Sequence, residues 1–298
     1  MNNKSVKSGF GIGCIIFAVA AIIALPLRVF QSFTLIEGST GFYTADNWSI
    51  SVLYAVLISA VLAILVFGII KRKKLDFSLE TVKRPGLAWL SLIAACGIML
   101  DAYKCFTEIM AVNETLLLSG NTDSDASKLI LAAEGIFAVL SSIYFIMLWL
   151  TYLKGKTNGS EIRLLALAPV IWNIFRLVVR FMRTISYIRV SELLFEMIAI
   201  AFMILFFNAF AQVNTGLGEK DGEWRIGAYG LPAALMTLIC FIPRLILTVS
   251  GNADLLYSQS TLQFCDLGTS LFIIAAVLTR VTDKLPEDKD KNTNTPEE

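Results

Sequence analysis

Arginine residues stand inside a stretch of the chain that is otherwise apolar enough to lie in a lipid bilayer. Arg176, Arg180 and Arg183 are four and three residues apart, and Asn173 comes three residues earlier, so a helix places all four on one face. Guanidinium groups that converge where water is scarce bind carboxylates and phosphates through paired hydrogen bonds. The spacing therefore predicts a binding face for a polar or anionic solute, with Arg176, Arg180 and Asn173 among the ligand contacts.

Charged residues in other apolar segments belong to the same pattern. The full set within the apolar segments is Arg28, Asp101, Lys104, Glu108, Glu134, Arg176, Arg180, Glu196, Arg244 and Asp266, with Arg183 and Glu192 at the rim. An ionised side chain at the centre of a bilayer costs roughly 2.5–3.5 kcal/mol on insertion scales, so such residues pair, face a protein interior or reach water. We therefore expect these segments to surround a charged chamber.

Each charged residue of this chamber has an expected role. The arginines at 176 and 180 have no acid on their own helical face, so their partners come from other helices. Arg244 follows Pro243, whose missing N–H leaves a helix carbonyl free, and we assign Arg244 a third ligand contact. The residues that balance the arginines or carry coupling protons are expected to be Asp101, Lys104, Glu134, Glu196, Asp266 and Arg28.

Several kinds of chemistry are absent from the sequence. There is no histidine, which excludes Ser-His and Cys-His nucleophile pairs and histidine metal sites within this chain. Cys14, Cys96, Cys105, Cys240 and Cys265 lie in apolar segments without a CxxC spacing, and we interpret them as small core residues. We therefore expect no catalytic residues, no metal, no cofactor and no enzyme activity.

Two more specific functions, a voltage sensor and an intramembrane aspartyl protease, compete with the charged chamber. Three unevenly spaced arginines with no pore-like segment after them do not make a voltage sensor. Asp101 and Asp266 lack the glycine-flanked context of intramembrane aspartyl proteases, and Lys104 close to Asp101 favours ionised carboxylates rather than a pair that shares a proton. Neither alternative explains the whole set of charges.

The composition places the chain in a membrane. Of its 298 residues, 56% are hydrophobic and only 16% are charged, whereas soluble domains have about 25% charged residues. A net charge of +1 indicates no nucleic-acid partner. The expected partners are therefore the lipid bilayer and a small ligand.

Eight segments are long and apolar enough to span a bilayer, since a spanning helix needs about 20 residues. They lie near residues 9–30, 49–70, 86–111, 129–153, 163–183, 190–212, 227–249 and 261–281. The predicted fold is an all-α, polytopic integral membrane helix bundle of about eight transmembrane helices in a single domain, 1–281. Residues 282–298 are polar and contain proline, and we expect a disordered cytoplasmic tail there.

The basic residues outside the spans predict the orientation. Sixteen Lys and Arg residues lie in the N-terminus, in the C-terminal tail and near 71–85, 154–163 and 213–225, against Lys128 and Arg189 in the opposite connections, near 31–48, 112–128, 184–189 and 250–260. By the positive-inside rule both termini are cytoplasmic, and we expect a plasma membrane location. With this threading the intramembrane charges lie in the outer half of the membrane.

The spans also resemble one another in pairs. Glu161 and Arg163 precede Pro169 in one segment, and Glu223 and Arg225 precede Pro232 in another, each at the start of a span. The pattern favours tandem helical hairpins threaded in the same direction, as in parallel-repeat transporters. Chance similarity between apolar segments is the alternative.

Two functions remain open from the sequence. The first is a multi-pass membrane protein that binds, and by extension transports, a small polar or anionic solute through the charged chamber. The second is a non-transporting sensor or accessory subunit whose intramembrane ion pairs serve packing and assembly. The basic segment 71–85 is expected to lie against anionic headgroups or to meet a cytoplasmic partner.

Overall fold

The computed structural model describes residues 11–37, 41–71, 83–119, 125–155, 163–183, 191–215, 223–256 and 262–282. Within these ranges the chain forms long α-helices and no strand. The helices are α1 (Gly11–Thr34), α2 (Trp48–Lys71), α3 (Pro85–Ser119), α4 (Asp125–Lys154), α5 (Ala168–Arg183), α6 (Ser191–Asn214), α7 (Glu223–Val249) and α8 (Phe264–Thr282), with short 3-10 turns η2 (Leu165–Leu167) and η3 (Ala253–Leu255). The predicted all-α fold class is confirmed.

The helices are those of a multi-pass membrane protein. Seven of them, α1 to α7, are long and apolar enough to cross a bilayer. The apolar part of α8, Phe264–Thr279, is shorter. At a rise of about 1.5 Å per residue, α8 is roughly 28 Å long, close to the thickness of the hydrocarbon layer. The eighth predicted segment is therefore a helix of nearly spanning length.

Some helix ends differ from the sequence prediction. The α3 helix continues to Ser119 and α4 begins at Asp125, so most of the connection predicted at 112–128 is helical. The physical reason is that α3 and α4 pack along each other, and a paired helical hairpin need not stop where the apolar segment stops. The predicted disordered tail, except for the helical Thr282, and most of the basic segment, residues 72–82, lie outside the described residues. The single-domain assignment stays a prediction.

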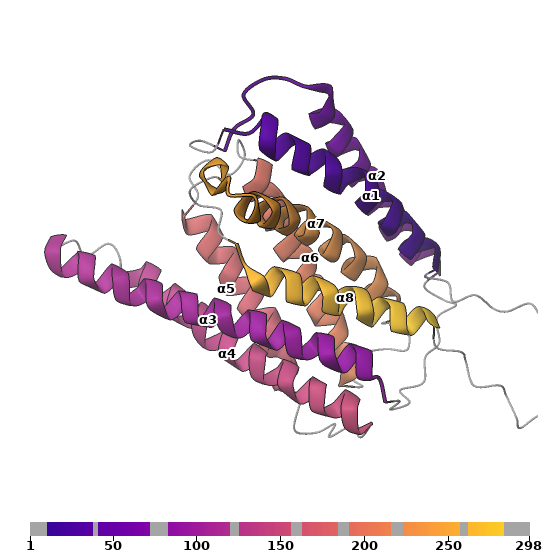
Figure 1. The fold of residues 1–298 in the computed structure, drawn as a ribbon. Coiled ribbons are helices and arrows are strands. Elements are labelled where there is room, and N and C mark those ends of the chain that lie inside the picture. The colour runs from indigo at the N-terminus through magenta and orange to yellow at the C-terminus, as the bar shows by residue number, and fades with distance from the viewer. Residues whose placement is uncertain are drawn as a thin grey trace, which may run out of the picture.

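The helices are arranged as layers of hairpins (Figure 1). The α1–α2 hairpin lies at one edge of the bundle and the α3–α4 hairpin at the opposite edge, with α5 to α8 between them. Helix α7 is central, because it packs against α1, α2, α6 and α8, while α3 packs against both α4 and α8. The start of α1 and the end of α8 lie at the same end of the bundle.

Aromatic side chains fill the half of the bundle nearer to those two helix ends. Phe145 of α4 and Phe272 of α8 meet edge to face with ring centroids 5.0 Å apart. Phe210 of α6 joins them through Phe272 at 5.4 Å. All three rings are fully buried, and such contacts add stability beyond the area that they bury. This half of the bundle is an apolar core.

Helices α3 and α8 approach each other through glycine. A Cβ at Gly97 would lie 2.7 Å from the carbonyl oxygen of Phe264, and one at Gly268 would lie 2.8 Å from the Cα of Ala94. Small residues let membrane helices pack backbone to backbone, which replaces the hydrophobic driving force that lipid does not provide. This crossing places the residues of α3 just before Asp101 beside the start of α8.

The α1–α2 hairpin exposes a large apolar surface. Exposed side chains on α1 and α2 include Ile15, Ile22, Ile58, Leu62 and Ile69. In water such a surface would be a liability, whereas against lipid tails it is the expected state. The exposed apolar faces therefore support contact with a lipid bilayer.

Candidate functional site

Helix α5 turns its polar stripe into the protein. Trp172, Asn173 and Arg176 are fully buried and Arg180 is nearly so. Residues on the opposite face of the helix, such as Ile174 and Phe181, are exposed. A membrane helix with one exposed face adopts this orientation because burying the guanidinium groups among polar partners costs less than exposing them to lipid. The side chain of Arg183 lies outside the described residues.

Arg176 contacts residues of α5, of α8 and of the segment before α8. Its Nη2 lies 2.5 Å from Oδ1 of Asp266 on α8 and also donates to Oε1 of Gln263. Its guanidinium carbon lies 5.4 Å from the centre of the Trp172 ring, a cation–π contact. Among the described residues, its Nε and Nη1 have no hydrogen-bond acceptor although both are buried. Arg176 thus has more donors than its protein partners accept.

A chain of ion pairs links α5, α6 and α7. Nη2 of Arg180 lies 2.7 Å from Oε1 of Glu196, and Oε2 of the same acid lies 3.3 Å from Nη2 of Arg244. Nε of Arg244 lies 2.5 Å from Oε1 of Glu192. The acid predicted to balance the arginines, Glu196, therefore serves two of them from different helices.

Arg28 lies at the α1 end of this chain. Its Nη1 donates to the hydroxyl of Tyr43 at 2.9 Å and to Oε1 of Gln31 at 3.4 Å. Its guanidinium carbon also lies 5.3 Å from the centre of the Phe195 ring. Arg28, Glu192 and Arg244 line a void of about 10 Å³, which is large enough for about one water molecule. This part of the network leaves no room for a solute.

A much larger cavity opens beside α5. It has a volume of about 470 Å³ and lies between the second half of α3, the first half of α4, the second half of α5 and the residues before α8. Its charged lining residues are Asp101, Lys104, Glu108, Glu134, Arg176 and Arg180. The volume is within the range of about 300–1,000 Å³ that is common for small-molecule sites. The cavity is therefore the candidate binding site.

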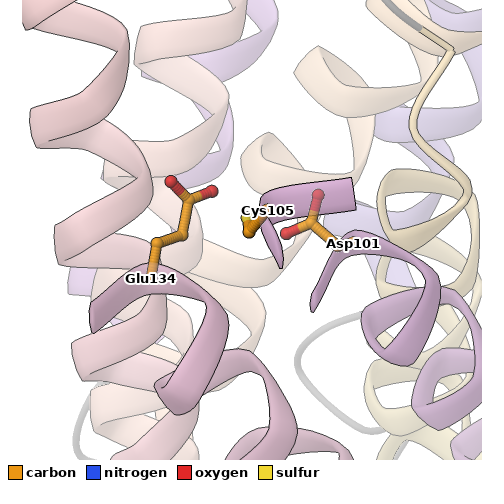
Figure 2. Close-up of side chains that lie close together, drawn as sticks. All are labelled: Asp101, Cys105 and Glu134. Carbon is orange, nitrogen blue, oxygen red and sulfur yellow. The ribbon is translucent and has the colours of Figure 1, made fainter. Parts of the chain in front are cut away.

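The wall formed by α3 and α4 is acidic. Asp101, Cys105 and Glu134 are all buried, and their carboxylate oxygens and thiol sulfur lie within 4.8 Å of one another. Figure 2 shows the carboxyl groups of Glu134 and Asp101 on either side of Cys105. Oδ2 of Asp101 accepts a hydrogen bond of 3.1 Å from Nε1 of Trp172. Asp101 and Glu134, both predicted to balance the arginines, are thus brought together from separate helices.

The close grouping of these three side chains also suits a cation. Carboxylates and a thiolate are ligands for divalent metals, although the sequence showed no such pattern and no metal was predicted. A single metal ion would occupy only a small part of a cavity of about 470 Å³. It would also leave the extra donors of Arg176 without an acceptor.

The structure separates the predicted site residues into two groups. Lys104, Asp101, Glu134, Arg176 and Arg180 line the cavity. The exposed Lys104 also donates from Nζ to the carbonyl of Leu262 at 2.6 Å, which connects α3 to the residues before α8. Outside the cavity lining are Asn173, Arg28, Arg244, Glu196 and Asp266.

Asn173 and Arg244, two of the predicted ligand contacts, do not line the cavity. The Nδ2 of Asn173 donates to the carbonyl of Pro169 at 2.8 Å, so its amide binds its own helix. Arg244 is occupied by two carboxylates and lines the small void instead. The physical reason is that residues on one helical face point in slightly different directions. The rotation of the helix about its axis therefore decides which of these residues reaches a cavity.

Three site residues were not identified from the sequence. Trp172 contacts an acid and an arginine of the cavity lining, since its Nε1 donates to Asp101 and its ring lies under the guanidinium of Arg176. Its position four residues before Arg176 is a usable signal, because residues at this spacing meet on one helical face. Cys105 follows Asp101 at the same spacing. Gln263 carried no comparable signal, since its contact with Arg176 depends on how α8 packs.

One further correction concerns the cysteines. Cys105, Cys240 and Cys265 are buried and Cys14 is half-buried, as expected for small core residues, but Cys96 is exposed on α3. It faces outward from an apolar segment.

No family model, curated protein or solved structure matches this chain.

Proposed function

We propose that this membrane protein binds a small polar or anionic solute in the cavity between α3, α4, α5 and α8. The observation that carries the proposal is the buried guanidinium of Arg176, which lines the cavity and has two donors without acceptors among the described residues. Unsatisfied buried donors cost about 1–3 kcal/mol each, and a ligand oxygen or a bound water would remove that cost. Arg180 is the second cationic contact.

The charge distribution supports an outward-facing cavity. The cavity lies near the C-terminal ends of α3 and α5 and the N-terminal ends of α4 and α8. This side of the bundle is opposite to the side where α1 begins and α8 ends. We propose that both termini are cytoplasmic and that the membrane is the plasma membrane, because the basic segments predict this orientation. The cavity would then receive its solute from outside the cell.

Movement of the bound solute is the natural extension of this proposal. Pro232 and Pro243 interrupt the hydrogen bonding of the central helix α7, and Pro26 does the same in α1. Such interruptions let helices bend around a central site. We propose binding and transport rather than an enzyme reaction, because the cavity offers charge recognition without an activated nucleophile.

The second candidate is a sensor or accessory subunit in which the charges serve packing. The chain of ion pairs through Glu196 favours it, since each arginine of that chain already has an acid partner. The two candidates differ in whether the cavity binds a solute. A binding measurement on the purified protein separates them.

The test is a thermal-shift screen of the full chain in detergent. Sodium salts of acetate, succinate, sulfate and phosphate are compared with the chloride at equal ionic strength. We expect at least one anion to raise Tm, and we expect Arg180→Gln to abolish that rise while Arg180→Lys keeps part of it. The matched control is Arg225→Gln, because Arg225 lies on Trp224 near the start of α7, away from the cavity.

The outcome also decides between the candidates. If no carboxylate, sulfate or phosphate raises Tm, or if Arg180→Gln shows the same rise as the unaltered chain, the cavity does not bind anions through Arg180. The packing function would then be preferred, particularly if Arg180→Gln also abolishes folding.

A further inference from the structure

Two buried side chains of the cavity lining have hydrogen-bonding capacity that the described residues do not use. One is Arg176, which is 1% exposed and whose Nε and Nη1 have no acceptor among those residues. The other is Asp101 of α3, which is 6% exposed. A cavity that offers both spare donors and a spare acceptor selects a ligand that has both kinds of group.

Asp101 is an acceptor with capacity left for a ligand. Its Oδ2 accepts the hydrogen bond of 3.1 Å from Nε1 of Trp172, and its Oδ1 accepts none from the residues that the structure describes. An ionised carboxylate has about four acceptor positions on its two oxygens. Glu108 and Glu134, the other acids of the lining, take part in further interactions of their own, so the spare acceptor is assigned to Asp101 alone.

The surroundings of Asp101 favour a neutral donor from the ligand. Lys104 lies three residues after Asp101, so both side chains leave α3 on the same face, and Arg176 lines the same cavity. A cationic group on the ligand would repel both of these bases in a medium of low dielectric constant. A hydroxyl donates to a carboxylate without adding charge, as the indole of Trp172 already does.

We propose that the solute of this cavity is a small hydroxycarboxylate, whose carboxylate meets Arg176 and Arg180 and whose hydroxyl donates to Oδ1 of Asp101. This rests on the proposed function, because it names the solute class of the same cavity. The volume of about 470 Å³ has room for a hydroxy acid of about three to six carbons. Leu131 and Val179, which belong to one apolar cluster, also line the cavity and give the carbon chain a surface to pack on.

Trp172 is the positioning residue of this arrangement. Its Nε1 donates to Asp101, and the centre of its ring lies 5.4 Å from the guanidinium carbon of Arg176. The side chain is fully buried, so one rigid group fixes the separation between the acceptor and the donors. A carboxylate without the hydroxyl brings its charge near Asp101 and gains no hydrogen bond there. A site built to bind a hydroxyl strongly rejects such an analogue.

The experiment compares acids that share a carbon skeleton and differ in their hydroxyl groups. The pairs are lactate with propanoate, 2-hydroxy-4-methylpentanoate with 4-methylpentanoate, and gluconate with hexanoate; alanine and leucine carry an ammonium group in place of the hydroxyl. We expect at least one hydroxy acid to raise the Tm of the purified full chain by about 5 °C near saturation. Its counterpart without hydroxyl groups should bind at least about tenfold more weakly in a calorimetric titration.

Asp101→Asn tests the acceptor. The indole of Trp172 would then donate to the single amide oxygen and turn the amide NH₂ toward the ligand, so the hydroxy acid should bind within about twofold of its counterpart. Arg180→Gln should instead weaken both compounds alike, because it removes a contact with the carboxylate that they share. Asp254→Asn, which changes an exposed acid in η3, is the matched control and should keep the preference for the hydroxy acid.

Trp172→Phe decides the question if Asp101→Asn does not fold. It keeps a ring under Arg176 and removes the indole N–H that holds Asp101. The carboxylate of Asp101 is then no longer held at a fixed separation from Arg176, so we expect the preference for the hydroxy acid to fall at least about threefold. The affinity for the counterpart should stay within about twofold, because the contacts of its carboxylate are kept.

Each contrary outcome has a distinct meaning. If the paired acids bind equally and Arg180→Gln weakens both, the proposed function holds and the hydroxyl assignment is wrong. The same conclusion follows if alanine or leucine binds more tightly than its hydroxy counterpart, or if sulfate or phosphate raises Tm and no carboxylate does. If Asp101→Asn and Trp172→Phe both keep the preference, Asp101 is not the acceptor and the inference is wrong. If no compound in this series or in the anion screen has an effect, both proposals are wrong.

Discussion

Glu196 is the residue on which the buried charge network depends. It is 2% exposed and contacts Arg180 of α5 through one carboxylate oxygen and Arg244 of α7 through the other. Removing one member of a buried ion pair is much more damaging than never having had the pair, because the remaining charge stays in a medium that solvates it poorly. Here one substitution would affect two arginines at once.

We therefore expect Glu196→Gln to lower the free energy of unfolding by about 3–5 kcal/mol, or to prevent folding altogether. Asp254→Asn, which removes an exposed acid, should change it by less than about 0.5 kcal/mol. Tm in detergent and the yield of monodisperse protein measure both effects. Equal stability of Glu196→Gln and the unaltered chain would mean that the network contributes little to the fold.

At the scale of helices, the α3–α8 crossing decides the shape of the cavity. Gly97 and Gly268 let the two backbones touch, and the contact lies one turn from Asp101 on α3 and close to Asp266 on α8. Gln263, just before α8, also lines the cavity. Any increase in the distance between these helices would move Gln263 and Asp266 away from Arg176.

Gly97→Ala tests this dependence. The new Cβ would lie 2.7 Å from a backbone oxygen of Phe264, so the helices must separate, and overpacking of this kind costs about 1–3 kcal/mol. The control is Gly86→Ala in the same helix, where nothing lies within 4 Å of the added Cβ and the higher helix propensity of alanine is the main effect. We expect a lower Tm for Gly97→Ala, and an unchanged or higher Tm for Gly86→Ala. A Gly97→Ala protein as stable as the control would indicate that α3 and α8 adjust without strain.

At the scale of the whole molecule, the bundle has one apolar half and one charged half. Phe145, Phe210 and Phe272 pack in the half nearer to Gly11 and Thr282, whereas the ion pairs and the cavity lie in the other half. In this conformation the cavity is reached from the end of the bundle that holds the charged half. The orientation of the chain therefore decides from which compartment a solute enters.

Labelling of single cysteines in sealed cells or vesicles checks the orientation. Asp254→Cys in η3 should react with a membrane-impermeant maleimide from outside, and Lys83→Cys should react only after permeabilisation, since both residues are exposed. The unaltered chain gives the background from its own cysteines, of which Cys96 is exposed within an apolar segment. The reverse labelling pattern would place the cavity on the cytoplasmic side.

The sequence by itself determined the number and order of the apolar helices, the helical face shared by Arg176 and Arg180, and the common depth of the charges. These properties depend on transfer free energies and on the period of 3.6 residues, both of which are local to each segment. The tertiary structure alone decided that Arg176 meets Asp266 of α8, that Arg244 pairs back with α6, and that Asn173 and Arg244 lie outside the cavity lining. Partner choice depends on which helices are neighbours and how each is rotated, and no single segment encodes either quantity.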